Sequence, residues 1–236
     1  MSAVALSFYY DKRGAISKAM HALMLVFLSG LVAGCGGLSI TNASPKVDYF
    51  ILQDLALPAP PTAAAPPRSS RVLLIAGSSS QALFDSERVV FTKDGISRSY
   101  YQFANWSERP GQSLAMLAET RLSRVGYFSA VTQSTSGVKA DLLLTLRLNE
   151  LTHDDSVSPG VMRLEVIADL LDWRTRELIA RRVFVGAVAV TSRDSVGGAQ
   201  AANRAVTRML DDLSPWVESN AATLKPAGIE TGLKRD

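Results

Sequence analysis

The clearest pattern along the chain is the alternation of apolar and polar residues in "DLLLTLRLNEL", residues 141 to 151. Such an alternation is typical of a β-strand that buries one face. The apolar face comprises Leu142, Leu144, Leu146 and Leu148, and the other face comprises Thr145, Arg147 and Asn149. Two further alternating runs, residues 162 to 170 and 178 to 190, flank the polar segment "DWRTRE". These two runs predict a long hairpin.

Shorter apolar runs earlier in the chain predict further strands. "YFIL", residues 49 to 52, predicts a short buried strand, and "RVLLIAG", residues 71 to 77, predicts a second apolar strand. Two strand-like runs lie on either side of Asp94-Gly95, a dipeptide that favours a tight hairpin. We expect these strands to be consecutive and antiparallel. "YFSAV", residues 127 to 131, predicts a return to the same sheet.

The segment "LPAPPTAAAPPR", residues 57 to 68, holds five prolines and is therefore predicted to be a loop. It has two interpretations. The prolines could form a polyproline ligand for a partner, or a stiff surface connection between two strands, which is the simpler reading.

Helical spacing appears twice. Leu114, Ala118 and Leu122 lie on one stripe of a predicted amphipathic helix that Gly126 closes. Residues 199 to 217 show the same spacing, and Pro215 predicts a kink or an early end there. The residues from 221 onward are polar and are expected to form a loose tail. Together these elements predict an α/β (α+β) fold, with one mixed, largely antiparallel sheet flanked by two main helices.

The apolar run at residues 19 to 32 is too short to span a hydrocarbon core, which needs about 20 helical residues. Lys12, Arg13 and Lys18 precede the run and small residues follow it, as in a signal peptide. The alternative is a short membrane helix, or an ordinary signal peptide with an incidental cysteine.

The single cysteine of the chain stands where this run ends, in "VAGC", residues 32 to 35. This tetrapeptide resembles the lipobox of bacterial lipoproteins. The resemblance implies cleavage before Cys35, diacylglycerol on its sulfur, and further acylation, such as by palmitate, at the new amino terminus. Residues 1–34 would then be the signal peptide and residues 35–46 a lipidated flexible tether. Gly36, rather than Asp, follows the cysteine, and by bacterial sorting rules this favours the outer membrane.

Composition excludes several classes of function. The 236 residues are 47% hydrophobic and 20% charged, which suits a globular domain rather than a disordered chain. Removal of residues 1–34 leaves 22 basic and 21 acidic residues, so the mature chain has no basic excess for nucleic acid. The arginines near 174 to 182 are interrupted by acidic residues and are expected to form a solvated hairpin. A single cysteine excludes a disulfide within the chain, and with only two separated histidines it leaves no Cys/His cluster for zinc.

No catalytic constellation is recognisable. "AGSSSQ", residues 76 to 81, lacks the second glycine of a nucleophile elbow, and no phosphate-binding loop is present. His153, Asp154 and Asp155 are contiguous and are expected to form a solvated turn rather than a metal site. Asp169 and Asp172 lie near a predicted turn and receive no role. We therefore predict that the protein is not an enzyme and uses no cofactor apart from its covalent acyl groups.

The order of elements resembles the ABC-type transport auxiliary lipoprotein family, which includes the PqiC-like lipoproteins. The resemblance covers roughly residues 49 to 217. Its most specific part is an aromatic strand followed by Trp106, then Pro110, then a long amphipathic helix, with the lipobox as independent support. The chain departs from the family pattern in its Pro-rich loop and at Arg176, where glycine is frequent.

The resemblance implies a function and partners. Residues 47–220 would be the ABC-type transport auxiliary domain and residues 221–236 a loose C-terminal tail. The protein would be a non-enzymatic auxiliary component of an MCE-type ABC lipid transport system. Its partners would be an MCE-type substrate-binding protein and an inner-membrane permease with its ATPase. Its expected location is the periplasmic face of the cell envelope, where it is lipid-anchored, with the outer membrane favoured.

Other hypotheses stay open at this point. The protein could be an envelope-structural or scaffold lipoprotein unrelated to transport, or a hydrolase whose site the sequence does not reveal. A homo-oligomer is also left open. Tyr100, Tyr101 and Trp106 could contact a partner or lipid, or fill the core; the core is favoured for Trp106.

Overall fold

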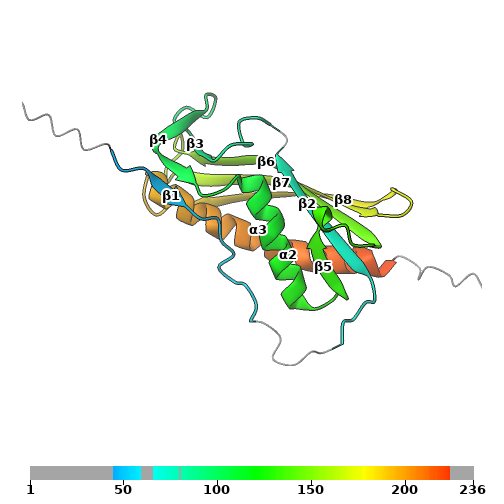
Figure 1. Cartoon of the computed structure of the whole chain (residues 1–236). Helices are drawn as coiled ribbons and strands as arrows, with labels where there is room; N and C mark the ends of the chain where they lie inside the picture. Colours follow the sequence, from blue (N-terminus) through cyan, green and yellow to red (C-terminus); the bar gives the residue numbers. More distant parts are fainter. Residues whose placement is uncertain (1–44, 60–65, 80, 224–236) are drawn as a thin grey trace, which may run out of the picture. The chain divides into compact units, whose positions relative to one another are not determined.

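In the part of the chain that the structure describes, the fold consists of an eight-stranded mixed sheet, two α-helices and one short 3₁₀ helix (Figure 1). A computed structural model describes residues 45–59, 66–79 and 81–223. The predicted signal peptide, Cys35 and most of the tether lie outside the described residues. The chain divides into the units Met1–Pro45 and Lys46–Asp236, and every element described belongs to the second unit. This architecture confirms the α+β class that the sequence predicts.

The bounds of the strands and helices follow the chain in order. The strands are β1 (Asp48–Phe50), β2 (Val72–Ser79), β3 (Arg88–Thr92), β4 (Ser99–Trp106), β5 (Ala130–Gln133), β6 (Leu142–Asp154), β7 (Val161–Asp172) and β8 (Leu178–Ala189). The helices are α2 (Pro110–Val125), the short 3₁₀ helix η2 (Ser134–Ser136) and α3 (Ser195–Thr223).

Strand β6 organises the sheet. On one side it pairs along its whole length with β7, which pairs with β8, and both pairings are antiparallel. On the other side its first half, 142–148, pairs with β2, and its last residues, 152–154, pair with β3. The sheet therefore divides into two branches along this edge of β6. One branch continues from β2 to β5, and the other continues from β3 to β4 and then β1. The predicted long hairpin of β7 and β8 is confirmed.

The expectation that the first strands are antiparallel neighbours is wrong in part. Among the described strands before β5, only β3 and β4 form an antiparallel pair. Strand β1 runs parallel to β4, and β2 runs parallel to both β5 and β6. Leu73, Leu74 and Ile75 of β2 are all buried. A continuous apolar run of this kind is typical of a strand covered on both faces, as parallel strands usually are.

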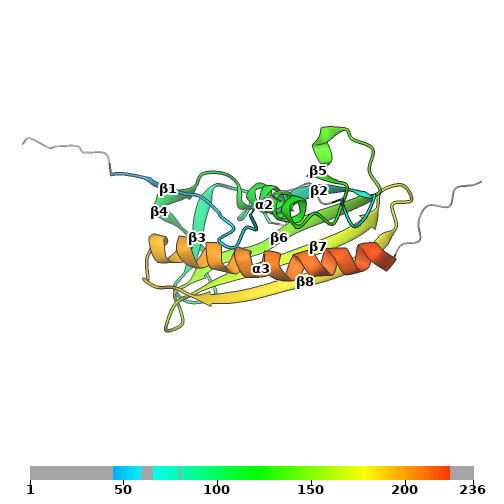
Figure 2. The ribbon, with the colours of Figure 1, turned by 90° about the horizontal axis from the view of Figure 1, so that it is seen from below.

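Both helices cover one face of the sheet. Helix α2 packs against β2, β5 and β6, helix α3 packs against β7 and β8, and the two helices touch each other (Figure 2). The apolar sides of β6 and β7 face them, so that Leu142, Leu146, Val166 and Leu170 are fully buried. The alternation in the sequence therefore maps onto inside and outside as predicted.

Helix α2 ends where the sequence predicts, whereas helix α3 is longer than predicted. Helix α2 ends at Gly126, which has a left-handed backbone with φ of 69°, as the sequence predicts. Helix α3, however, continues through Pro215 to Thr223. The early end, one of the two effects predicted for Pro215, does not occur, and residues 221–223, predicted as the start of the tail, belong to the helix. The physical reason is that the turn beyond the proline is anchored, because Val217 and Ala221 are fully buried.

Arg176 occupies the turn between β7 and β8 with a left-handed φ of 65°. Glycine adopts this conformation most easily, which accounts for the frequency of glycine at this point of the family pattern. Here the guanidinium lies 3.6 Å from the centre of the Trp173 ring. This cation–π contact offsets part of the conformational cost of a side chain in the left-handed region.

Candidate functional site

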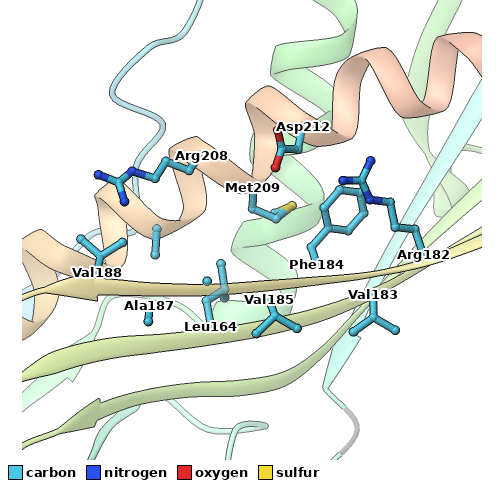
Figure 3. A pocket seen from close by; sticks show the side chains of 12 residues that line it. Leu164, Arg182, Val183, Phe184, Val185, Ala187, Val188, Arg208, Met209 and Asp212 are labelled. Atoms are coloured by element: carbon cyan, nitrogen blue, oxygen red, sulfur yellow. The ribbon is translucent and has the colours of Figure 1, made fainter. Parts of the chain in front are cut away.

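A groove lies between helix α3 and the outermost strand β8 (Figure 3). Its volume is about 520 Å³. Leu164 of β7 and Phe184 and Val188 of β8 line it from the sheet, and Ala205 and Met209 line it from α3. Figure 3 shows Phe184 and Met209 pointing toward each other from the strand and the helix. These apolar side chains are each at most 5% exposed, so they are packed between the strand and the helix. Val183 and Val185 point to the other face of the sheet.

Gly186 keeps the groove open. It shares a face of β8 with Phe184 and Val188, which are both buried, and it pairs with Leu164 of β7. A Cβ atom built at Gly186 would have no heavy atom within 4 Å, and its backbone is not left-handed. Neither the backbone nor a close neighbour requires glycine here. The missing side chain thus leaves space between the strand and the helix.

Charged side chains stand at the mouth of the groove. Arg182, Arg208 and Asp212 line it together with the apolar residues. The Arg182 guanidinium lies 4.7 Å from the centre of the Phe184 ring. Within residues 45–59, 66–79 and 81–223, neither Arg182 nor Arg208 forms an ion pair. The mouth therefore carries two arginines and one carboxylate.

His153 and Asp154 are not in a solvated turn, contrary to the expectation from the sequence. Both belong to β6, and their exposed fractions are 0% and 3%. Asp154 accepts a hydrogen bond from Arg163 Nε at 2.7 Å and one from the Ser156 backbone N–H. The physical reason is that β7 pairs with β6 to its last residue, so the strand extends further than the alternation suggested.

Asp155 and Asp169 also form ion pairs. Asp155 follows the strand and binds Arg193, and Asp169 pairs with Arg181 of the neighbouring strand at 2.5 Å. Asp172 accepts hydrogen bonds from the backbone N–H groups of the turn, and these hold the pKa of its carboxyl below the ordinary value. No group of three or more His, Cys, Asp or Glu side chains in the described part of the chain is arranged to hold a metal ion.

A polar pair joins the buried His153 to the partly buried Tyr101. The Tyr101 hydroxyl lies 2.8 Å from His153 Nδ1, and Gly198 at the start of α3 packs against the ring. Burial lowers the pKa of His153, although the nearby Asp155 and Asp194 carboxylates oppose this. Burial also raises the pKa of Tyr101 to about 12. Both groups are thus held neutral at neutral pH, and the pair joins β4 to β6 beneath the first turn of α3.

The other aromatic residues singled out in the sequence have different environments. Trp106 is 2% exposed and lies in the core, in an edge-to-face contact with Phe50. Tyr100 is partly buried under the Arg88 guanidinium. A partner contact through Tyr100 or Tyr101 stays a prediction.

The predicted buried strand "YFIL" is buried on one side alone. Tyr49 and Ile51 are 65% and 59% exposed, whereas Leu52 is buried. The reason is that β1 is an edge strand whose only pairing, among the described strands, is with β4. Alternate residues of β1 therefore face outward.

A buried ion-pair cluster was not recognised in the sequence. Arg121 of α2 donates to both carboxylate oxygens of Asp54, from Nε at 2.7 Å and from a terminal nitrogen at 2.5 Å. Its other terminal nitrogen donates to Asp211 of α3 at 2.6 Å. The side chains of Arg121 and Asp54 are 7% and 0% exposed. The available signal was an arginine placed beside the apolar stripe of the predicted helix.

Comparison with known proteins places the chain in a family. The family model described as ABC-type transport auxiliary lipoprotein component matches residues 54–214. The chain belongs to this family. The resemblance found in the sequence is thereby confirmed, and the protein is an ABC-type transport auxiliary lipoprotein. A comparison with curated protein sequences gave no match.

Solved structures support the fold of this auxiliary lipoprotein. It is similar to protein XCC0632 from Xanthomonas campestris, of family DUF330, with a TM-score of 0.63 at 20% identity, over 74% of this chain and 97% of that one. It is also similar to a structure described as an uncharacterized protein, with a TM-score of 0.53 at 11% identity, over 72% and 99% of the two chains. Among the described residues of the auxiliary lipoprotein, no helix is both long and apolar enough to cross a membrane.

Proposed function

We propose that the protein is the auxiliary component of an MCE-type ABC system that moves lipid across the cell envelope. The observation that carries this proposal is membership of the transport auxiliary family over residues 54–214. In this proposal an inner-membrane permease and its ATPase supply the energy, an MCE-type protein carries the lipid, and the auxiliary lipoprotein contributes contacts at the periplasmic face.

The proposed anchor is Cys35. Diacylglycerol on its sulfur and an acyl group such as palmitate on its amino terminus would hold the protein at the membrane, because one acyl chain alone binds only marginally. Gly36 supports the outer membrane as the destination. Residues 35–46 would then link the anchor to the domain that begins near β1.

The contribution is proposed to be non-enzymatic. The titratable residues that might have formed a catalytic site are engaged elsewhere, since Asp154, Asp155 and Asp169 pair with arginines and His153 pairs with Tyr101. These contacts hold strands and turns together. They support a role through position and binding.

Replacement of the lipidation site should separate folding from function. We expect Cys35→Ala to leave the domain folded but to abolish incorporation of a labelled fatty acid and membrane association. In a deletion strain, this variant should fail to restore the envelope permeability barrier. Lys46→Gln, in the same tether, is the control and should be labelled and complement like the wild type. Fatty-acid labelling or membrane sedimentation of Cys35→Ala would contradict the anchor.

A further inference from the structure

We propose that an apolar face of β1 and β4 rests on the surface of the lipid bilayer that carries the anchor. This face, called the β1 patch, consists of the side chains of Val47, Tyr49, Ile51 and Phe103. The inference rests on the proposed anchor at Cys35, which is part of the proposed function. It goes further by naming the surface of the domain that contacts lipid.

Three members of the β1 patch form a row on the first strand. Val47, Tyr49 and Ile51 are all exposed and occupy every second position along the chain. The residues that alternate with them turn inward, since Leu52 lies in the core and Phe50 packs against it. Successive side chains of an extended chain point to opposite faces. The three exposed side chains therefore project from one face.

Strand β4 adds an aromatic side chain to this row. Tyr49 pairs with Asn105 in the parallel ladder between β1 and β4. Phe103 is exposed, and it lies on the same face as Asn105 because two residues separate successive positions on one face. Ala104 and Trp106 point to the other face and are buried. Since β1 is the outermost strand of this branch of the sheet, no other described strand extends the patch (Figure 1).

Helix α3 fixes the backbone that presents the β1 patch. The Asn203 side chain donates a hydrogen bond to the Ile51 carbonyl at 3.3 Å and accepts one from the Gln53 N–H at 3.0 Å. The Thr207 hydroxyl accepts a hydrogen bond from the Leu55 N–H at 2.9 Å. The apolar side chains are thus held outward on an ordered segment. Such exposed apolar surface is typical of an interaction site.

The chain between the anchor and the β1 patch favours the bilayer as its occupant. Residues 36–46 separate Cys35 from the patch, and a chain of this length covers at most about 40 Å when fully extended. The anchor therefore keeps the patch close to the bilayer, so that a weak contact is enough to orient the domain. The exposed Val183 and Val185 of β8 have no such link, because β8 lies on the other side of β6.

The chemistry of the β1 patch also fits a bilayer surface. Tyrosine is enriched at membrane–water interfaces, because its ring is apolar and its hydroxyl can stay in water. The charged side chains of Lys46 and Asp48, next to the patch, lie 3.3 Å apart and balance each other. We therefore expect the patch to contact a zwitterionic bilayer and to need no anionic lipid.

A fluorescent label on Asn105 tests the inference in the full-length, acylated lipoprotein in phosphatidylcholine nanodiscs. Acylation blocks the sulfur of Cys35, so the thiol of an Asn105→Cys variant is the one that reacts with the environment-sensitive dye NBD. Its emission should shift to the blue, and a phosphatidylcholine with a nitroxide high on the acyl chain should quench it. Val185→Cys is the matched control, because Val185 is also apolar and exposed but lies on β8. Its label should show neither effect.

Two double variants of the labelled Asn105→Cys protein show whether the β1 patch causes the contact. Tyr49→Ser with Ile51→Ser should lower the quenching to the level seen at position 185. The melting temperature and the acylation should stay unchanged, because both side chains are exposed. Val183→Ser with Val185→Ser removes exposed apolar surface from β8 instead and should leave the quenching at position 105 intact.

Four outcomes overturn the inference. Equal quenching at positions 105 and 185, or full quenching in the Tyr49→Ser and Ile51→Ser variant, would exclude the β1 patch as the contact. A blue shift at position 105 without quenching would show that protein, such as a second copy of the chain, covers the patch. Either result in acylated protein that still recovers an MCE-type partner from cells would leave the proposed function standing. Reaction of the dye with Cys35 would show that the anchor is absent and would overturn both proposals.

Discussion

Arg121→Met is expected to destabilise the protein by about 3–5 kcal/mol, the cost of leaving a buried charge without its partner. Arg121 satisfies both oxygens of the fully buried Asp54 carboxylate, and it joins the segment after β1 to α2 and, through Asp211, to α3. Methionine fills a similar volume but leaves Asp54 unpaired. Urea unfolding followed by circular dichroism measures the loss.

An exposed ion pair is the control for this prediction. Lys46 and Asp48 lie 3.3 Å apart with side chains 89% and 45% exposed, so Lys46→Met should change the free energy of unfolding by less than about 0.5 kcal/mol. The double variant Arg121→Met with Asp54→Leu should recover part of the loss, since it removes the stranded charge. Similar small effects of Arg121→Met and Lys46→Met would show that the buried cluster does not hold the helices.

His153→Gln is expected to remove a pH dependence of stability. Burial lowers the pKa of His153 in the folded protein below the ordinary value of 6.5. Just below pH 6.5 the histidine therefore binds a proton in the unfolded chain but stays neutral in the folded protein. Stability is therefore complete above pH 6.5 and falls as the pH drops below it. The wild type should lose up to about 2 kcal/mol from this residue at pH 5, and His153→Gln should not.

The measurement is thermal or urea unfolding of both proteins at pH 5 and pH 7.5. Asp155→Asn is the control for a nearby change of charge and should keep the histidine's pH dependence. His153→Gln should also lower stability at pH 7.5, because the Tyr101 hydroxyl loses a well-placed partner in the interior. An identical pH dependence in wild type and His153→Gln would mean that the buried ring does not resist protonation.

Much of the fold could be predicted because local pattern and tertiary burial agree there. The alternating leucines from Leu142 to Leu148 and the apolar side of α2 both face the core. Gly126 adopts the left-handed conformation that commonly follows the end of a helix. Patterns of nearby residues in the sequence are enough to predict these elements. The resemblance to the family predicted how they follow one another along the chain.

What could not be predicted depends on contacts between distant segments. Strand β2 lies between β5 and β6 and runs parallel to both, although both follow it far along the chain. Its apolar run predicts a buried strand but does not identify these partners. The acidic residues after His153 suggested a solvated position, but the strand pairs with β7 there and Gly198 of α3 packs against the histidine ring. In the sequence, Gly186 is a glycine inside a predicted strand and has no visible role. Only the position of α3 opposite β8 shows that its missing side chain leaves a groove.

The central claim, that the protein works in an MCE-type lipid transport complex, is tested most directly by identifying its neighbours in cells. The tagged full-length lipoprotein is crosslinked mildly in intact cells, purified, and analysed by mass spectrometry, with a tagged unrelated envelope lipoprotein as control. The account predicts an MCE-type protein or its permease, enriched over the control. Recovery of cell-wall or other scaffold components alone would contradict it and favour an envelope-structural lipoprotein.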